Sequence, residues 1–210
     1  MKRKRFLFVS VAFFAAFVIW TVLVSVLDVG AIGPDGSKVG LSGLNGHFHL
    51  LTGVNWWLYN VTDWLGLVPI AVALGFGVFG LIQWISRKSI LKVDRSIIAL
   101  GCFYVAVVLA YVLFEYVVIN YRPVLIGGDL EASYPSSTTM LVTCVMPTAI
   151  MQLRGRIKNS ALRWAVVIAI VIFIAFMVIG RLISGVHWLS DIIGGALLSI
   201  ALVCGYSCFA

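Results

Sequence analysis

The sequence predicts an all-α integral membrane protein, a bundle of six transmembrane helices whose N- and C-termini both lie in the cytoplasm. Of its 210 residues, 62% are hydrophobic and only 11% are charged, and the mean hydropathy is +1.09. These values are far from those of soluble domains. Several apolar runs reach roughly 20 residues, enough to cross about 30 Å of hydrocarbon. The uneven distribution of basic residues supplies the orientation.

The six spans follow one another along the whole chain. The first comes after a basic N-terminal stretch, but its apolar run exceeds that of a signal peptide, so it is interpreted as a retained anchor. The second has the least defined start, and the third ends before Pro123, which stops a helix. The spans are expected at residues 6–28, 55–85, 97–119, 136–153, 164–183 and 187–208.

The chain is expected to form a single membrane-embedded domain over residues 1–210, because it contains no internal repeat, low-complexity segment or nucleotide-binding glycine loop. Its four cysteines lack Cys-x-x-Cys spacing and all fall within predicted spans. They therefore indicate neither a disulfide framework nor a thiolate metal site. These cysteines are Cys102, Cys144, Cys204 and Cys208.

Three blocks of basic residues set the predicted orientation. With six spans, all three fall on one side, which the positive-inside rule assigns to the cytoplasm. The net charge of +7 therefore reflects topology and adhesion to an anionic leaflet, and it does not indicate a nucleic-acid partner. The blocks are Lys2 to Arg5, then Arg87, Lys88, Lys92 and Arg95, then Arg154, Arg156, Lys158 and Arg163.

The same topology brings three polar segments to the outer mouth of the bundle. Arg122 follows the third span, where it is either part of a site or an interfacial anchor. Ser136, Ser137 and Thr138 begin the fourth span, where hydroxyls and free N–H groups can form an anion cradle or simply cap the helix. Their convergence indicates one site.

The third segment contains Arg181, His187 and Asp191 between the fifth and sixth spans. If the chain is helical from His187 onward, His187 and Asp191 share a face at i and i+4, where a carboxylate can fix the imidazole tautomer. Arg181 adds a planar cation suited to phosphate or carboxylate. The sequence therefore predicts a site for an anion.

These residues resemble the type 2 phosphatidic acid phosphatase superfamily of membrane lipid phosphatases. Its signature is Lys-x6-Arg-Pro, then Pro-Ser-Gly-His, then Ser-Arg-x5-His-x3-Asp. Arg122-Pro123 matches the end of the first block, Pro135-Ser136 starts the second, and the spacing of Arg181, His187 and Asp191 matches the third. The six-span layout is also similar to this family, so the resemblance covers nearly the whole chain.

The resemblance implies roles for individual residues. His187 would be the nucleophile that forms a phosphohistidine, and Asp191 would orient it. Arg122, Arg181 and Ser136 would hold phosphate oxygens, and Ser137 and Thr138 are further candidate phosphate-binding residues. It also implies a phospholipid or isoprenoid phosphate substrate in the bilayer, no metal or other cofactor, and a bacterial plasma membrane with the site facing outward.

The chain departs from the signature at several positions. Glu115 stands where the family has its lysine, and Gly180 replaces the serine before Arg181. Ser137 and Thr138 replace the glycine and histidine of the second block. In the family, that histidine is the usual general acid for the leaving group.

Three functional hypotheses follow. The favoured one is hydrolysis of a lipid diphosphate such as an isoprenoid diphosphate, whose leaving group needs little acid catalysis; Glu115, Glu131 or Asp129 would be the substitute acid or modulator. In the second, Glu115 neutralises Arg122 or Arg181, and the protein is a non-catalytic lipid-phosphate binder or membrane partner. The third is phosphotransfer to an acceptor other than water.

Overall fold

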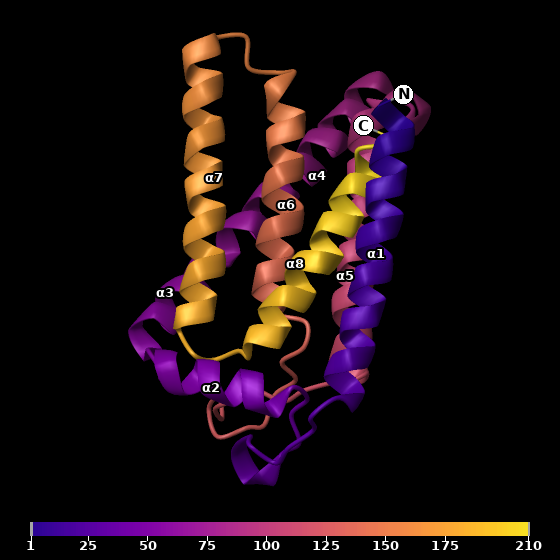
Figure 1. The fold of residues 1–210 in the computed structure, drawn as a ribbon. Helices are drawn as coiled ribbons and strands as arrows, with labels where there is room; N and C mark the ends of the chain where they lie inside the picture. The colour runs from indigo at the N-terminus through magenta and orange to yellow at the C-terminus, as the bar shows by residue number, and fades with distance from the viewer. Residues whose placement is uncertain (1, 210) are drawn as a thin grey trace.

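The computed structural model describes residues 2–209 and shows an all-helical chain (Figure 1). Two 3-10 helices, η1 (Pro34–Gly36) and η2 (Ile90–Lys92), lie between the longer helices, and the described residues contain isolated β-bridges but no strand. The α-helices are α1 (Lys2–Val26), α2 (Ser42–Thr52), α3 (Trp56–Leu65), α4 (Leu67–Arg87), α5 (Arg95–Tyr116), α6 (Ser137–Arg154), α7 (Ser160–Ile183) and α8 (Leu189–Tyr206).

Helices α1, α4, α5, α6, α7 and α8 run along the length of the molecule, whereas α2 and α3 lie across one end (Figure 1). Helix α1 packs along α8, and α6 contacts α4, α5, α7 and α8. The two termini lie at the end opposite α2 (Figure 1). The connections after α1, α5 and α7 therefore meet at the α2 end.

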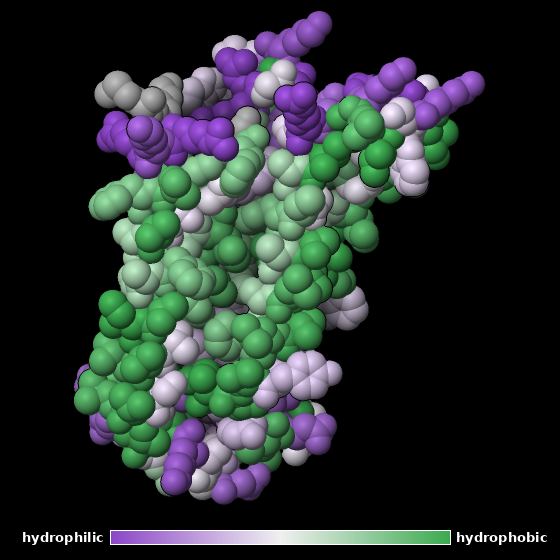
Figure 2. All heavy atoms as spheres, turned by 90° about the vertical axis from the view of Figure 1, so that its right-hand side faces the viewer, coloured by the Kyte–Doolittle hydropathy of each residue, from purple (hydrophilic) through white to green (hydrophobic). Residues whose placement is uncertain are grey.

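Within residues 2–209, five segments are long and apolar enough to cross a membrane: Arg3–Val26, Trp56–Arg87, Arg95–Tyr116, Ser160–Ile183 and Leu189–Tyr206. A belt of hydrophobic atoms separates two hydrophilic ends on the face shown in Figure 2. The fourth expected span forms α6, which is not among the five. This helix includes Pro147 and Gln152, and because four helices surround it, fewer of its side chains need to be apolar.

The second expected span begins with two helices instead of one. Gly66 joins α3 to α4 with a helical backbone, so Trp56–Arg87 still counts as one apolar segment. The sixth expected span starts at residue 187, but α8 begins only at Leu189. His187 consequently precedes the helix, so its i, i+4 pair with Asp191, at 3.8 Å, does not lie on a helical face.

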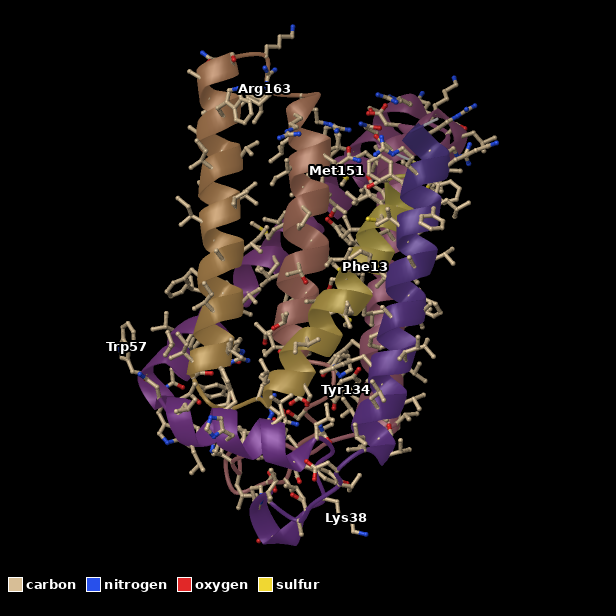
Figure 3. All side chains as sticks on the ribbon, viewed as in Figure 1. Phe13, Lys38, Trp57, Tyr134, Met151 and Arg163 are labelled. Carbon is tan, nitrogen blue, oxygen red and sulfur yellow. The ribbon has the colours of Figure 1, made fainter. Side chains whose placement is uncertain are left out.

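The basic blocks gather at the end that carries the termini. Asp94 binds Arg87 at 2.9 Å and Arg156 at 3.6 Å, which connects the α4–α5 turn with the α6–α7 turn. The Cys208 thiol lies 3.6 Å from the carbonyl oxygen of Arg3, so the two ends of the chain are neighbours. Figure 3 places Arg163 at this end.

The turn between α7 and α8 rests against the α2–α3 junction. Gly185 has a φ of +68°, and a Cβ there would lie 1.8 Å from the carbonyl oxygen of Gly53. The Asn55 N–H donates to the carbonyl oxygen of Ser184 at 3.0 Å. Only glycine allows this approach, and it fixes the turn that carries His187.

Buried polar side chains tie the remaining connections together. Asn45 of α2 donates to the Gly40 carbonyl at 2.8 Å and to the Ser190 hydroxyl at 2.9 Å. Asn120, after α5, accepts from the Gly40 N–H at 3.1 Å. These contacts bring the segments after α1 and α5 against the start of α8.

Candidate active site

His187 is the centre of the candidate site. It lies in the α7–α8 turn and is only 3% exposed. Its Nε2 atom is 3.2 Å from Nη1 of Arg122, and its Nδ1 atom is 3.1 Å from the Ser133 hydroxyl. Arg122 and His187, which come from different expected segments, are therefore brought into direct contact.

The protonation of His187 follows from these contacts. A guanidinium can only donate hydrogen bonds, so Nε2 must accept one and carries no proton. Burial, followed by the positive charge of Arg122, lowers the pKa of His187 to about 4. His187 is therefore neutral near pH 7 and presents an unprotonated ring nitrogen.

Asp191 lies in the first turn of α8 and is fully buried. Its Oδ2 atom accepts from the Trp188 N–H at 2.9 Å, as a capping carboxylate does at a helix start. It is 3.8 Å from Nδ1 of His187, which is longer than a hydrogen bond. The pair of His187 and Asp191 expected from their spacing is therefore present as an ion-pair contact but not as a direct hydrogen bond.

Arg122 lies in the irregular segment that joins α5 to α6 and is 8% exposed. Its backbone N–H donates to the Glu131 carbonyl at 3.0 Å. Its Nε atom is also 3.0 Å from the Glu131 carboxylate, although this ion pair lacks the alignment of a hydrogen bond. Glu131 therefore contacts Arg122 twice, through a backbone hydrogen bond and through an ion pair with its guanidinium.

Arg181, in the last turn of α7, is 2% exposed. Its Nη2 atom donates to the Thr138 hydroxyl at 2.7 Å and to Asp63 at 3.0 Å. Its guanidinium also lies 5.0 Å from the centre of the Tyr59 ring, a cation–π arrangement. The buried Nε and Nη1 atoms have no hydrogen-bond partner within the described residues, so the guanidinium has donors that are not used.

The three residues expected to form an anion cradle at the N-terminus of α6, Ser136, Ser137 and Thr138, make different contacts. The Ser136 hydroxyl accepts from the Thr139 N–H at 3.4 Å, so it caps the helix. The Ser136 N–H donates to the Asp191 carbonyl at 3.0 Å. Thr138 reaches Arg181, and Ser137 lines a cavity of about 430 Å³ beside Arg122.

Glu115 lies near the end of α5 and is exposed. It lines the same 430 Å³ cavity as Arg122, Glu131 and Ser137. It forms no ion pair with either arginine among the described residues. Arg122 instead pairs with Glu131, and Arg181 pairs with Asp63. Asp129 is exposed in the loop before α6.

The sequence did not indicate two residues that contact the candidate site, Asp63 and Ser133. Asp63 is an isolated acid inside the second apolar run, a pattern that generally marks function in membrane segments. Ser133 gave no comparable signal, because one serine in a polar loop is unremarkable without knowing its partners. No cluster of three or more His, Cys, Asp or Glu side chains suited to a metal ion occurs within residues 2–209.

Two buried cations, a helix N-terminus and a bare imidazole nitrogen together suit the binding and attack of a phosphoryl group. The sequence model of the PAP2 superfamily matches residues 102–210, the part of the chain that contains all three polar segments. The chain belongs to the PAP2 superfamily. Its members are phosphatases, so membership supports a lipid-phosphatase-like function and, in general, hydrolysis of a phosphoester.

The PAP2 fold extends over nearly the whole molecule. The structure resembles the crystal structure of a transmembrane PAP2-type phosphatidylglycerolphosphate phosphatase from Bacillus subtilis with a TM-score of 0.65 and 20% sequence identity. The match covers 95% of this chain and 94% of the other. A comparison with curated protein sequences gave no match. With its apolar helices, this PAP2 protein is a multi-pass membrane protein.

Proposed function

We propose that this PAP2 protein hydrolyses a lipid phosphate or diphosphate through a phosphohistidine at His187, with an isoprenoid diphosphate as the favoured substrate. The observation that carries the proposal is the 3.2 Å contact between Nε2 of buried His187 and the guanidinium of Arg122, from which the unprotonated state of Nε2 is inferred. A nucleophile and a cation that can hold the phosphoryl oxygens are thus adjacent.

In the proposed reaction, the Nε2 lone pair attacks phosphorus and the P–O bond to the leaving group breaks. Arg122 and Arg181 stabilise the charge on the phosphoryl oxygens. Water then attacks the phosphohistidine, the P–N bond breaks, and phosphate leaves as His187 regains its lone pair. The free donors of Arg181 at Nε and Nη1 support its role in holding oxygens.

The leaving group determines which substrate is favoured. Thr138, at the position of the family's acidic histidine, is bonded to Arg181. A hydroxyl is a poor acid, and the loss of a general acid costs on the order of 10²–10⁴-fold in rate. A phosphate leaving group is much less basic than an alkoxide and tolerates this loss. Glu131 and Glu115, which line the cavity beside Arg122, are candidate proton donors.

An apolar cavity of about 550 Å³ supports a lipid substrate. It begins at Asp63 and Thr138, which both contact Arg181, and continues along α5 past Val107 and Val108. Ser137 lines both this cavity and the polar one beside Arg122. An amphiphile could therefore place its phosphate at the arginines and its hydrocarbon tail in the groove.

We also propose six membrane spans, with α6 as the fourth, in one domain over residues 1–210. The match in length between α6 and α8, 18 residues each, supports this count. Because the basic blocks lie opposite the site, the positive-inside rule supports cytoplasmic termini and an outward-facing site in a cell membrane, such as a bacterial plasma membrane.

A second candidate function is lipid-phosphate binding without catalysis. The ion pairs of Arg122 and Arg181 favour this alternative, because each arginine lies 3.0 Å from a carboxylate that would compete with phosphate. In this alternative, Glu131 and Asp63, instead of Glu115, weaken the cradle.

Phosphate release separates the two candidates. Purified protein in detergent is given a short-chain isoprenoid diphosphate or a lipid monophosphate, and His187→Ala and His47→Ala are compared with the native chain. If the protein is a hydrolase, the native chain and His47→Ala should release phosphate, and more of it from the diphosphate than from the monophosphate. His187→Ala should release none. His47 is exposed on α2 and serves as the matched control. Equal background from all proteins would contradict hydrolysis and favour binding.

A further inference from the structure

The carboxylate of Asp191 is already occupied by donors other than His187. The Trp188 N–H donates to Oδ2 at 2.9 Å, while the Asn120 amide and the Ser190 hydroxyl each lie 3.3 Å from Oδ1. The carboxylate is fully buried, so these contacts are not exchanged with bulk water. Asp191 is thereby fixed to the start of α8, and the distance of 3.8 Å leaves His187 Nδ1 without a direct bond to it.

Ser133 fills the position between the two side chains. Its hydroxyl contacts the Asp191 carboxylate and lies 3.1 Å from Nδ1 of His187. Its backbone N–H donates to the Asn120 carbonyl at 2.9 Å, and the residue is 2% exposed. The hydroxyl is therefore held in place from a segment that belongs to neither α7 nor α8.

The direction of each hydrogen bond follows from what the groups can donate. The Ser133 hydroxyl donates to Oδ2 of Asp191, so its single proton is used in that hydrogen bond. The Ser133 oxygen then accepts from His187, which requires a proton on Nδ1. The donation from Arg122 independently requires Nε2 to be bare. Both sides of the imidazole thus specify the same tautomer.

We infer that Ser133 is a positioning residue that links the Asp191 carboxylate to His187 through hydrogen bonds and holds the imidazole with its proton on Nδ1. The order is Asp191, Ser133 hydroxyl, Nδ1–H of His187, with Nε2 directed at Arg122. The inference deepens the proposed function, since it assumes that Nε2 is the attacking atom. It assigns the immediate orienting role to a residue of the α5–α6 connection.

The tautomer can be measured directly by ¹⁵N NMR of the imidazoles in the full-length protein in detergent micelles. The chain has only 3 histidines, so the loss of signals in His187→Ala assigns His187. We expect a protonated-type shift at Nδ1 and an unprotonated-type shift at Nε2. Ser133→Ala should convert part of the population to the other tautomer, and Ser133→Thr, which keeps the hydroxyl, should restore the native pattern.

The kinetic expectation accompanies the spectroscopic one. Because a misoriented nucleophile loses on the order of 10²-fold in rate, Ser133→Ala should lower kcat by about that factor with little change in KM, and Ser133→Thr should recover most of it. Ser199→Ala is the matched control, because Ser199 is a buried serine whose hydroxyl bonds the Met140 carbonyl at 3.4 Å in the α6–α8 contact.

Either of two results would overturn the inference: a native protein with its proton on Nε2, or an unchanged tautomer in Ser133→Ala. Failure of the proposed function is recognised separately. If an alkaline quench with diphosphate labelled by ³²P at its terminal phosphorus traps no phosphohistidine in the native chain, hydrolysis through His187 is wrong. A tautomer that still depends on Ser133 would nevertheless support the structural assignment.

Discussion

Asp63 and Glu131 form ion pairs with Arg181 and Arg122, respectively. The Asp63 side chain is 56% exposed, so its ion pair with Arg181 is largely hydrated on one side. Ion pairs between exposed side chains contribute about 0.2–1 kcal/mol, and the exposure of Asp63 screens this pair in the same way although Arg181 is buried. A phosphate that engages the other donors of the guanidinium can therefore displace the carboxylate.

Asp63→Asn should therefore strengthen the binding of inorganic phosphate or orthovanadate by about 1.5- to 5-fold, the factor that corresponds to a pair of that strength. The inhibition constant of either anion in the phosphate-release assay measures the effect. Asp35→Asn, which changes an acid in η1 and in none of the contacts around Arg181, is the control. Weaker inhibition in Asp63→Asn would instead show that Asp63 orients Arg181.

His187 should stay neutral well below the usual range for histidine. Burial, and next the charge of Arg122, lowers its pKa to about 4 from 6.5. We expect its imidazole ¹⁵N signals to keep the neutral pattern at pH 5. A midpoint at or above 6.5 in the native chain would contradict the charge distribution described here.

The same shift makes folding stability depend on pH. Between pH 6.5 and about 4, the unfolded chain binds a proton at His187 and the folded chain does not. Stability should therefore fall as the pH is lowered through this window, and His187 should contribute no pH dependence above it. The thermal midpoint in detergent should decline less steeply in His187→Ala over the same interval.

The sequence was informative about which residues carry charge in the site, but not about their partners. Arg122, Arg181, His187 and Asp191 could be identified because charged residues are rare in an apolar chain. Their contacts join positions far apart in sequence, such as Asp63 with Arg181 and Ser133 with His187. Such pairs depend on how the connections pack, which hydropathy and spacing do not describe.

At the scale of helices, apolar run length predicted most elements well. The fourth span, expected at residues 136–153, forms α6 at Ser137–Arg154. The sequence did not predict that α6 would be surrounded by four helices, because its composition alone does not identify its neighbours. The α2 helix and the junction at Gly66 were also missed, since both depend on packing across the end of the bundle.

The groove beside α5 gives a prediction about substrate length. Val108 lines the apolar cavity and is 57% exposed. Val108→Trp should fill part of it and lower kcat/KM for long-chain substrates, with little effect on short-chain ones. Lipid phosphates of increasing tail length measure the difference.

Val105→Trp is a matched control for this substitution. Val105 lies on the same helix with 59% exposure, but it lines a different cavity, between α4 and α5, together with Gly80 and Gly101. A similar loss in both variants, or an equal loss for short and long tails, would argue against the groove as the tail site.

Over the whole molecule, the basic blocks and the candidate site lie at opposite ends. Figure 3 places Arg163 at one end and Lys38 at the other. The positive-inside rule predicts that the Lys38 end faces outward. In intact cells, a membrane-impermeant thiol reagent should label Lys38→Cys directly and Lys158→Cys only after permeabilisation.

The native chain supplies the background for that experiment, since its four cysteines are all free. Labelling of Lys158→Cys but not Lys38→Cys in intact cells would reverse the orientation and place the site in the cytoplasm. Labelling of both without permeabilisation would exclude their separation by a membrane.

The close approach of Gly185 to Gly53 has a consequence for the depth of the reaction in the bilayer. Exposed tryptophans of α3, including Trp57, which points away from the bundle in Figure 3, are suited to the water–lipid interface. Since the turn that carries His187 packs against this segment, the tryptophans at the interface determine how deep His187 lies in the bilayer. In a thicker or thinner bilayer, the position of the lipid headgroups would change at the end of the bundle that carries the termini. The distance of the imidazole from the headgroups on its own side would stay the same.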